Sequence, residues 1–229
     1  MKKASLIIVI VVICLATVLA TSACNFDKII ENIKNSGEGT ADYSADDKYH
    51  SLGILEEVLA GSLNNPNMVV TARNGDSLYF TEFVVGDKDC TVYSDTDKVY
   101  AVKDGDQYKV IRTLGKSYTV GKDVYDENYC RFKQFIIKNV DEKFKDGTFS
   151  CTRHIEEKGE QSEGNFTFNY TGENGDSYQI VGSERNDLVQ AITITAKQDG
   201  VEASLTLDFA YGSAAVTVPD ITDYNEYNK

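Results

Sequence analysis

Tight-turn dipeptides recur along the chain and limit its fold more than any other feature of the sequence. Asn-Gly or Asp-Gly pairs begin at Asn74, Asp104, Asp146, Asn174 and Asp199, between short segments rich in Val, Ile, Thr, Tyr and Phe. Because both residues of such a pair tolerate positive φ, a pair between two alternating segments is typical of a β-hairpin. About a dozen of these segments follow Pro66. They predict a large, mostly antiparallel sheet, which its own twist would curl.

A helix is expected directly before the strands. Apolar residues recur there at helical spacing, at Leu52, Leu55, Val58, Leu59 and Leu63. Ser44 or Asp46 can cap this helix at its start, and Asn64-Asn65-Pro66 should end it because proline cannot continue a helix. Packing against the sheet is the expected role of the apolar stripe.

A second apolar stripe lies between the two groups of strands. It consists of Tyr129, Phe132, Ile136, Val140 and Phe144, with Asp126 as a cap. It predicts a helix over residues 127–144, with a strand over 132–140 as the alternative. The expected fold class is therefore α+β: one curled, half-barrel-like, mostly antiparallel sheet of about 11–12 strands packed on one or two helices.

The N-terminus has the layout of a secretory signal peptide. Lys2 and Lys3 precede an uncharged, mostly apolar run over residues 4–23, which ends in Ala20-Thr21-Ser22-Ala23 directly before Cys24. A cysteine in this place can take a diacylglyceryl group on its thiol, and cleavage then frees its amine. The segment resembles a bacterial lipobox, with Thr21 where Leu is usual. We expect residues 1–23 to be removed and Cys24 to carry diacylglyceryl and palmitate groups.

Two alternatives to a lipid anchor are an uncleaved single-span anchor, since about 20 apolar residues can cross a bilayer, and simple secretion. Both anchored forms place the protein at the extracytoplasmic face of the cell membrane. Residues 24–43 are then expected to form a juxtamembrane segment and flexible linker, because residues 35–41 are small and polar. The curled sheet and helix domain should span 44–220, followed by a disordered tail at 221–229.

The charge of the chain restricts its partners. There are 23 basic and 36 acidic residues, a formal net charge of −13, and loss of Lys2 and Lys3 with the signal peptide makes it −15. Such a field repels nucleic acid, so no nucleic-acid partner is expected. The membrane is the expected partner, through the lipid anchor at Cys24.

Catalytic and metal-binding motifs are absent from the sequence. It holds no GxSxG, HExxH, SxxK, P-loop or dinucleotide fingerprint, and its two histidines, His50 and His154, imply no triad. No cysteine spacing fits a zinc site. We therefore expect neither an enzyme nor a cofactor or metal site. For Cys90, Cys130 and Cys151, the interpretations are a Cys130–Cys151 or Cys90–Cys151 disulfide, or buried free thiols.

The order of elements resembles the LolA/LppX-like group of exported lipoprotein carriers. The resemblance rests on the helix end at residues 65–71 and on the closing hairpin of residues 204–211 and 216–219. It implies a half-barrel over an apolar cavity, for which Leu52, Leu55, Leu59 and Leu63 are the candidate lining residues. The implied function is non-enzymatic binding of a lipid or other apolar ligand. The alternative is a protein–protein interaction or envelope-structure module.

Overall fold

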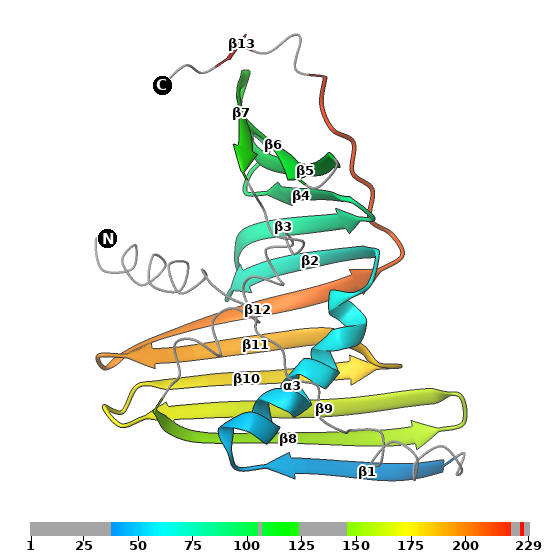
Figure 1. Ribbon diagram of the computed structural model, residues 1–229, viewed down its shortest axis with the longest axis vertical. Helices are drawn as coiled ribbons and strands as arrows, with labels where there is room; N and C mark the ends of the chain where they lie inside the picture. Colours follow the sequence, from blue (N-terminus) through cyan, green and yellow to red (C-terminus); the bar gives the residue numbers. More distant parts are fainter. Residues whose placement is uncertain (1–37, 105–106, 124–145, 221–224, 227–229) are drawn as a thin grey trace. The chain divides into compact units, whose positions relative to one another are not determined.

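The computed structural model describes residues 38–104, 107–123, 146–220 and 225–226 (Figure 1). Its elements are β1 (Glu38–Ala45), α3 (Lys48–Leu63), β2 (Asn67–Asn74), β3 (Ser77–Val85), β4 (Lys88–Val92), β5 (Asp97–Asp104), β6 (Gln107–Leu114), β7 (Ser117–Asp123), β8 (Gly147–Lys158), β9 (Gln161–Gly172), β10 (Ser177–Arg185), β11 (Leu188–Gln198), β12 (Val201–Tyr211) and β13 (Asn225–Glu226). The strands are hydrogen-bonded in the order β1-β8-β9-β10-β11-β12-β2-β3-β4-β5-β6-β7-β13. The predicted α+β class, a large and mostly antiparallel sheet with a helix packed on it, is confirmed.

Contacts within the chain divide it into two units. Unit 1 comprises Met1–Leu63 and Phe135–Ser204, and unit 2 comprises Asn64–Gln134 and Leu205–Lys229. In the described residues, unit 1 therefore holds α3, β1 and β8 to β11. Unit 2 holds β2 to β7, β13 and most of β12.

The core of unit 1 lies between α3 and one face of its strands. Cys151, Phe168, Ile180 and Ile194 form one row across β8, β9, β10 and β11. All four side chains are buried. Helix α3 packs on β8, β11 and β1. The alternation of apolar and polar residues along each strand thus directs one face to the helix, and the residues of the other face are half-buried or exposed.

Helix α3 begins one residue after an aspartate cap. The carboxylate of Asp47 accepts a hydrogen bond from the backbone N–H of His50 at 3.0 Å. The prediction of Ser44 or Asp46 as the cap is wrong, because β1 extends through Ala45 and Asp47 directly precedes the first helical residue. The predicted end before Pro66 is confirmed, since α3 ends at Leu63.

Strand β1 corrects the predicted linker. Residues 24–43 were expected to be a juxtamembrane segment and flexible linker before a domain starting at 44, but Glu38–Ala45 pairs antiparallel with β8 along its whole length. Its alternate residues Ala41, Tyr43 and Ala45 are half-buried. The strand therefore belongs to the folded domain. Two of its three inward side chains are alanines, so the strand alternation is weak in the sequence. The small and polar composition of the segment therefore suggested a linker.

Unit 2 has buried residues on both faces of its strands. On one face, Cys90, Tyr100 and Ile111 form a cluster, with Phe83, Val92, Val216 and Val218 packed against it. Residues on the other face, among them Met68, Val70 and Phe209, are also buried. This pattern accounts for the continuous apolar character of β2 and β5.

Several predictions fall outside the described residues: the signal peptide, the lipidation site Cys24, Cys130, and the choice between helix and strand at 127–144. The predicted disorder of 221–229 is wrong for Asn225 and Glu226, which pair parallel with Ser117 and Tyr118 of β7. Among the described residues, no helix has the length and apolar character needed to cross a membrane.

Candidate functional site

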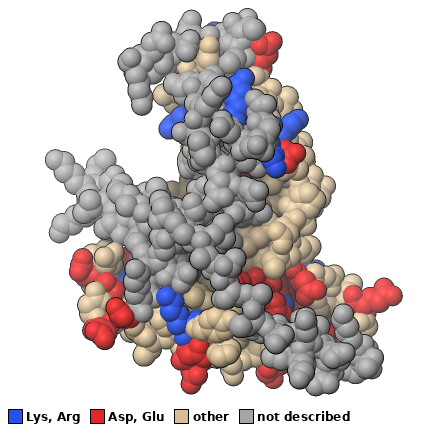
Figure 2. All heavy atoms as spheres, in the orientation of Figure 1, with Lys and Arg blue, Asp and Glu red and all other residues tan. Residues whose placement is uncertain are grey.

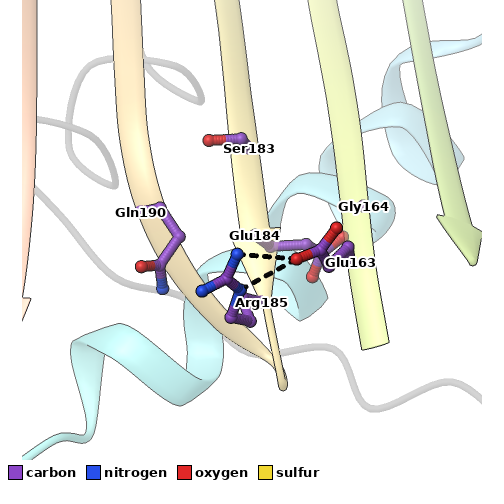
Figure 3. A pocket seen from close by; sticks show the side chains of 6 residues that line it. All are labelled: Glu163, Gly164, Ser183, Glu184, Arg185 and Gln190. Carbon is purple, nitrogen blue, oxygen red and sulfur yellow. Dashed lines mark hydrogen bonds and ion pairs between the residues drawn. The ribbon is translucent and has the colours of Figure 1, made fainter. Parts of the chain in front are cut away.

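A polar hollow lies where the start of β9, the end of β10 and the start of β11 are neighbours in the sheet (Figure 3). It has a volume of about 360 Å³ and is lined by Glu163, Gly164, Ser183, Glu184, Arg185 and Gln190. The register of β10 against β11 shifts between Ser183 and Glu184, so that Gln190 has no direct partner in the ladder. Such a bulge bends a strand and redirects its side chains. It explains why this end of the sheet is hollowed.

The rim of the hollow carries an exposed ion pair. The guanidinium of Arg185 donates to one carboxylate oxygen of Glu163 through Nε at 3.1 Å and Nη2 at 2.6 Å. The two side chains are 59% and 56% exposed. Gln190 donates through Nε2 to the carbonyl of Leu188 at 2.9 Å. The hollow therefore presents charged and amide groups to a ligand, and an exposed pair of this kind adds little to stability.

The conformation of the turn at Asn186 and Asp187, beside the hollow, is held by its backbone geometry and by contacts with α3. Asn186 and Asp187 have φ values of 51° and 60°, as a type I′ hairpin turn requires. The end of α3 approaches this turn closely: a Cβ on Gly61 would lie 2.2 Å from the carbonyl oxygen of Asp187. Ser62 Oγ accepts a hydrogen bond from the N–H of Val189 at 2.9 Å. Only glycine at position 61 allows this contact.

A buried ion pair lies behind the hollow, on the side of the sheet that faces α3. Arg153 donates from Nε and Nη2 to the two carboxylate oxygens of Glu184, both at 2.7 Å. Its Nη1 donates to Glu57 of α3 at 2.9 Å. Only 5% of the Arg153 side chain and 4% of the Glu184 side chain are exposed. Arg153 thereby joins β8, β10 and α3.

The surroundings of Arg153 keep it charged. Burial would lower the pKa of Arg153, but the hydrogen bonds and negative charge of Glu184, with Glu57 and Asp187, raise the pKa above its ordinary value. Its guanidinium also lies 5.9 Å from the ring centroid of Tyr43, within cation–π range. Burial, followed by the charge of Glu57, raises the pKa of Tyr43. This cluster is a rigid support behind the hollow, with all three guanidinium nitrogens in use.

The residues predicted to line an apolar cavity lie on α3, away from this hollow. Leu55, Leu59 and Leu63 are buried, and Leu52 is half-buried. They share one side of the helix. Their role as cavity lining stays a prediction, and the residues of the hollow were missed. Asn186-Asp187 is a turn signal that a search for Asn-Gly and Asp-Gly overlooks.

The two cysteines in the described residues are free, buried thiols. The interpretation as free thiols is confirmed for Cys90 and Cys151, and both proposed disulfides are wrong because each requires Cys151. Burial raises the pKa of Cys90 to about 11, with a contribution from Asp89, and burial raises the pKa of Cys151 to about 12. Since the thiolate is the reactive form, neither residue is suited to nucleophilic chemistry at neutral pH.

Native protein treated with iodoacetamide at about pH 8 should therefore leave Cys90 and Cys151 unmodified, because both thiols are protonated and shielded there. Peptide mapping by mass spectrometry measures the modification of each cysteine. The same protein alkylated in guanidinium chloride serves as the control, and both residues should then react fully. Equal rates in the two conditions would contradict the burial of these thiols.

The remaining candidates from the sequence are surface groups. His50 contacts its own helix cap, with Nδ1 2.7 Å from Asp47. His154 lies 2.6 Å from Asp42 across β8 and β1. Within the described ranges, no group of three or more His, Cys, Asp and Glu residues is placed to hold a metal ion.

Comparison with known proteins adds no relative. No protein-family model matches the chain, and no curated protein matches it.

Proposed function

We propose that this protein is a lipoprotein anchored through Cys24 at the extracytoplasmic face of the cell membrane, where it acts as a non-enzymatic binding module. The polar hollow between β9, β10 and β11 carries this proposal. It is an open concave site held by a bulge, a type I′ turn and a buried ion pair. Ligand sites are concave and usually largely pre-formed, and placed polar groups give them specificity. The lipobox-like segment before Cys24 supports the anchor.

Carriage of a lipid or other apolar ligand is the function implied by the resemblance to LolA/LppX-like carriers. In such a carrier, part of the α3 stripe would face a cavity. Leu55, Leu59 and Leu63 are instead buried on the helix side that packs on the sheet. The described residues therefore support a polar binding site better than an apolar one. Native mass spectrometry of the purified protein separates the two: co-purified lipid would favour carriage.

The binding function is tested by photo-crosslinking in the producing cell. A photoreactive residue at Ser183, on the exposed rim of the hollow, is compared with one at Glu56, which is exposed on α3. Position 183 should give a reproducible covalent adduct and position 56 should not, because the ligand lies at the hollow. No adduct at 183, or the same adducts at both positions, would contradict the proposal.

The anchor depends on a single thiol. Cys24→Ser should abolish acylation and leave the unprocessed precursor, because serine offers no thiol for the diacylglyceryl group. Metabolic labelling with a fatty-acid analogue measures this, and Cys14→Ser is the matched control that should keep its label. If the Cys24→Ser protein carries label at the wild-type level, the anchor is not at Cys24. An intact Met1 in the mature protein would favour the single-span alternative.

A further inference from the structure

The face of unit 1 that points away from α3 carries two adjacent rows of uncharged residues, all of them polar except Val181. One row crosses five strands and consists of Ser44, Thr152, Thr167, Val181 and Thr193. The next crosses four strands and consists of Ser150, Asn169, Gln179 and Thr195. We call these nine residues the neutral face. It holds no ionisable side chain, although the chain has a net charge of −13.

The neutral face is partly exposed and partly ordered by its own hydrogen bonds. Ser44, Thr152 and Gln179 are exposed, and the other polar residues of the face are half-buried. Val181, near the middle, is 41% exposed. Gln179 donates to Asn169 at 2.7 Å, and Asn169 donates to Ser150 at 3.2 Å. The amide groups are therefore held in a fixed direction across neighbouring strands, with donors and acceptors alternating along the row.

The hollow continues this face. Ser183 of the hollow lies two residues beyond Val181 on β10, so both side chains point to the same side of the sheet. Asp and Glu side chains are visible on the side of unit 1 that carries α3 (Figure 2). On β9 to β11, the neutral face thus continues through Asn165, Ser183 and Ala191 to the hollow and the Glu163–Arg185 pair. On β1 and β8, the same row holds the ion-paired Asp42 and His154, which border the surface.

The chemistry of this surface selects its partner. A polyanion would be repelled by the net charge of the protein. The core of a protein–protein interface is usually enriched in aromatic residues, Met and Arg, and the neutral face contains none of these. Hydroxyl and amide groups that both donate and accept hydrogen bonds match the hydroxyls of sugars. Neighbouring strands lie about 4.8 Å apart, a spacing close to the length of one pyranose unit in an extended glycan.

We propose that the neutral face and the hollow bind a neutral, hydroxyl-rich polysaccharide laid across the strands of unit 1. The inference rests on the proposed binding function and names its ligand class. Each sugar unit would meet one strand, and five strands give a contact about 20 Å long. A terminal sugar would occupy the hollow beside Ser183, Gln190 and the Glu163–Arg185 pair. Without aromatic rings on this face, each unit binds weakly, and affinity comes from the number of units bound at once.

The test is affinity electrophoresis of the full chain in a polyoxyethylene detergent, which carries no sugar. The gels contain hydroxyethyl cellulose or dextran as neutral polysaccharides, or polygalacturonate as a polyanion. The test variant is T152V/T167V, which removes two hydroxyls from a cross-strand pair of the neutral face. The matched control is T71V/T81V, a cross-strand threonine pair of β2 and β3 in unit 2. Valine keeps the shape and strand propensity of threonine, so both variants should fold.

At least one neutral polysaccharide should retard the wild-type protein, and polygalacturonate should not. T152V/T167V should weaken this binding about tenfold or more, since two hydrogen bonds are lost, and T71V/T81V should leave it unchanged. Absence of retardation by both neutral polymers, equal effects of the two variants, or equal retardation by the polyanion would overturn the inference. If the Ser183 crosslink persists in that case, the binding function stands with another ligand. If the crosslink is also absent, both fail.

Discussion

Arg153→Ala should lower the free energy of unfolding by about 3–5 kcal/mol, because it leaves Glu184 buried without its bidentate partner. Glu184 is 4% exposed, and both of its carboxylate oxygens accept hydrogen bonds from Arg153 at 2.7 Å. The same change removes the contacts of Arg153 with Glu57 on α3 and with the ring of Tyr43. Urea unfolding followed by circular dichroism measures the loss.

The chain offers a matched control for Arg153. Arg185 also pairs with a glutamate, Glu163, but these side chains are 59% and 56% exposed. Arg185→Ala should therefore lower the free energy of unfolding by no more than about 1 kcal/mol, the range of surface pairs. If both variants lose the same free energy of unfolding, the ion pair of Arg153 with Glu184 is not buried away from water.

A double variant separates the pair from the packing around it. Replacing both Arg153 and Glu184 with Met and Leu removes the two buried charges together. Buried ion pairs replaced by apolar residues of similar volume are often neutral or stabilising. R153M/E184L should therefore regain much of the stability lost in Arg153→Ala. A double variant as unstable as the single one would place the loss in packing and in the contact with Glu57 rather than in an unpaired charge.

The features that the sequence predicted correctly are local. Turn dipeptides such as Asn174-Gly175 and Asp199-Gly200 impose positive φ within a few residues, and the structure has hairpin turns at both places. The stripe of α3 is likewise set by residues three or four apart. Such local patterns predict where strands and helices occur, and the order of these elements along the chain predicts the α+β class.

Features that depend on residues far apart in the chain were not predicted. Arg153 and Glu184 are 31 positions apart and meet because β8, β9 and β10 are in register. Neither residue differs in its local pattern from a solvent-exposed charge. The bulge at Gln190, which opens the hollow, is a mismatch between two strands that no single strand reveals. Strand β1 was missed because its inward side chains at positions 41 and 45 are alanines.

Helix α3 allows a direct test of whether its apolar stripe is packed or lines a cavity. Leu59 is 1% exposed on the side of α3 that packs on the sheet. Leu59→Ala should lower the free energy of unfolding by about 2–5 kcal/mol, the range for a leucine removed from a packed core. Leu52 is only half-buried on the same helix, so it has fewer contacts to lose. Leu52→Ala should lower it by less than about 1.5 kcal/mol.

Both variants keep the helix propensity of the position, because alanine is the best helix former, so the difference between them reports packing alone. Urea unfolding curves should be measured beside titration with a fluorescent fatty-acid probe. For a packed core, we expect a large loss at Leu59, a small loss at Leu52 and no binding of the probe by the parent protein. A small loss at Leu59 together with saturable probe uptake that Leu59→Ala weakens would place a cavity under α3. That result would favour lipid carriage over polar binding.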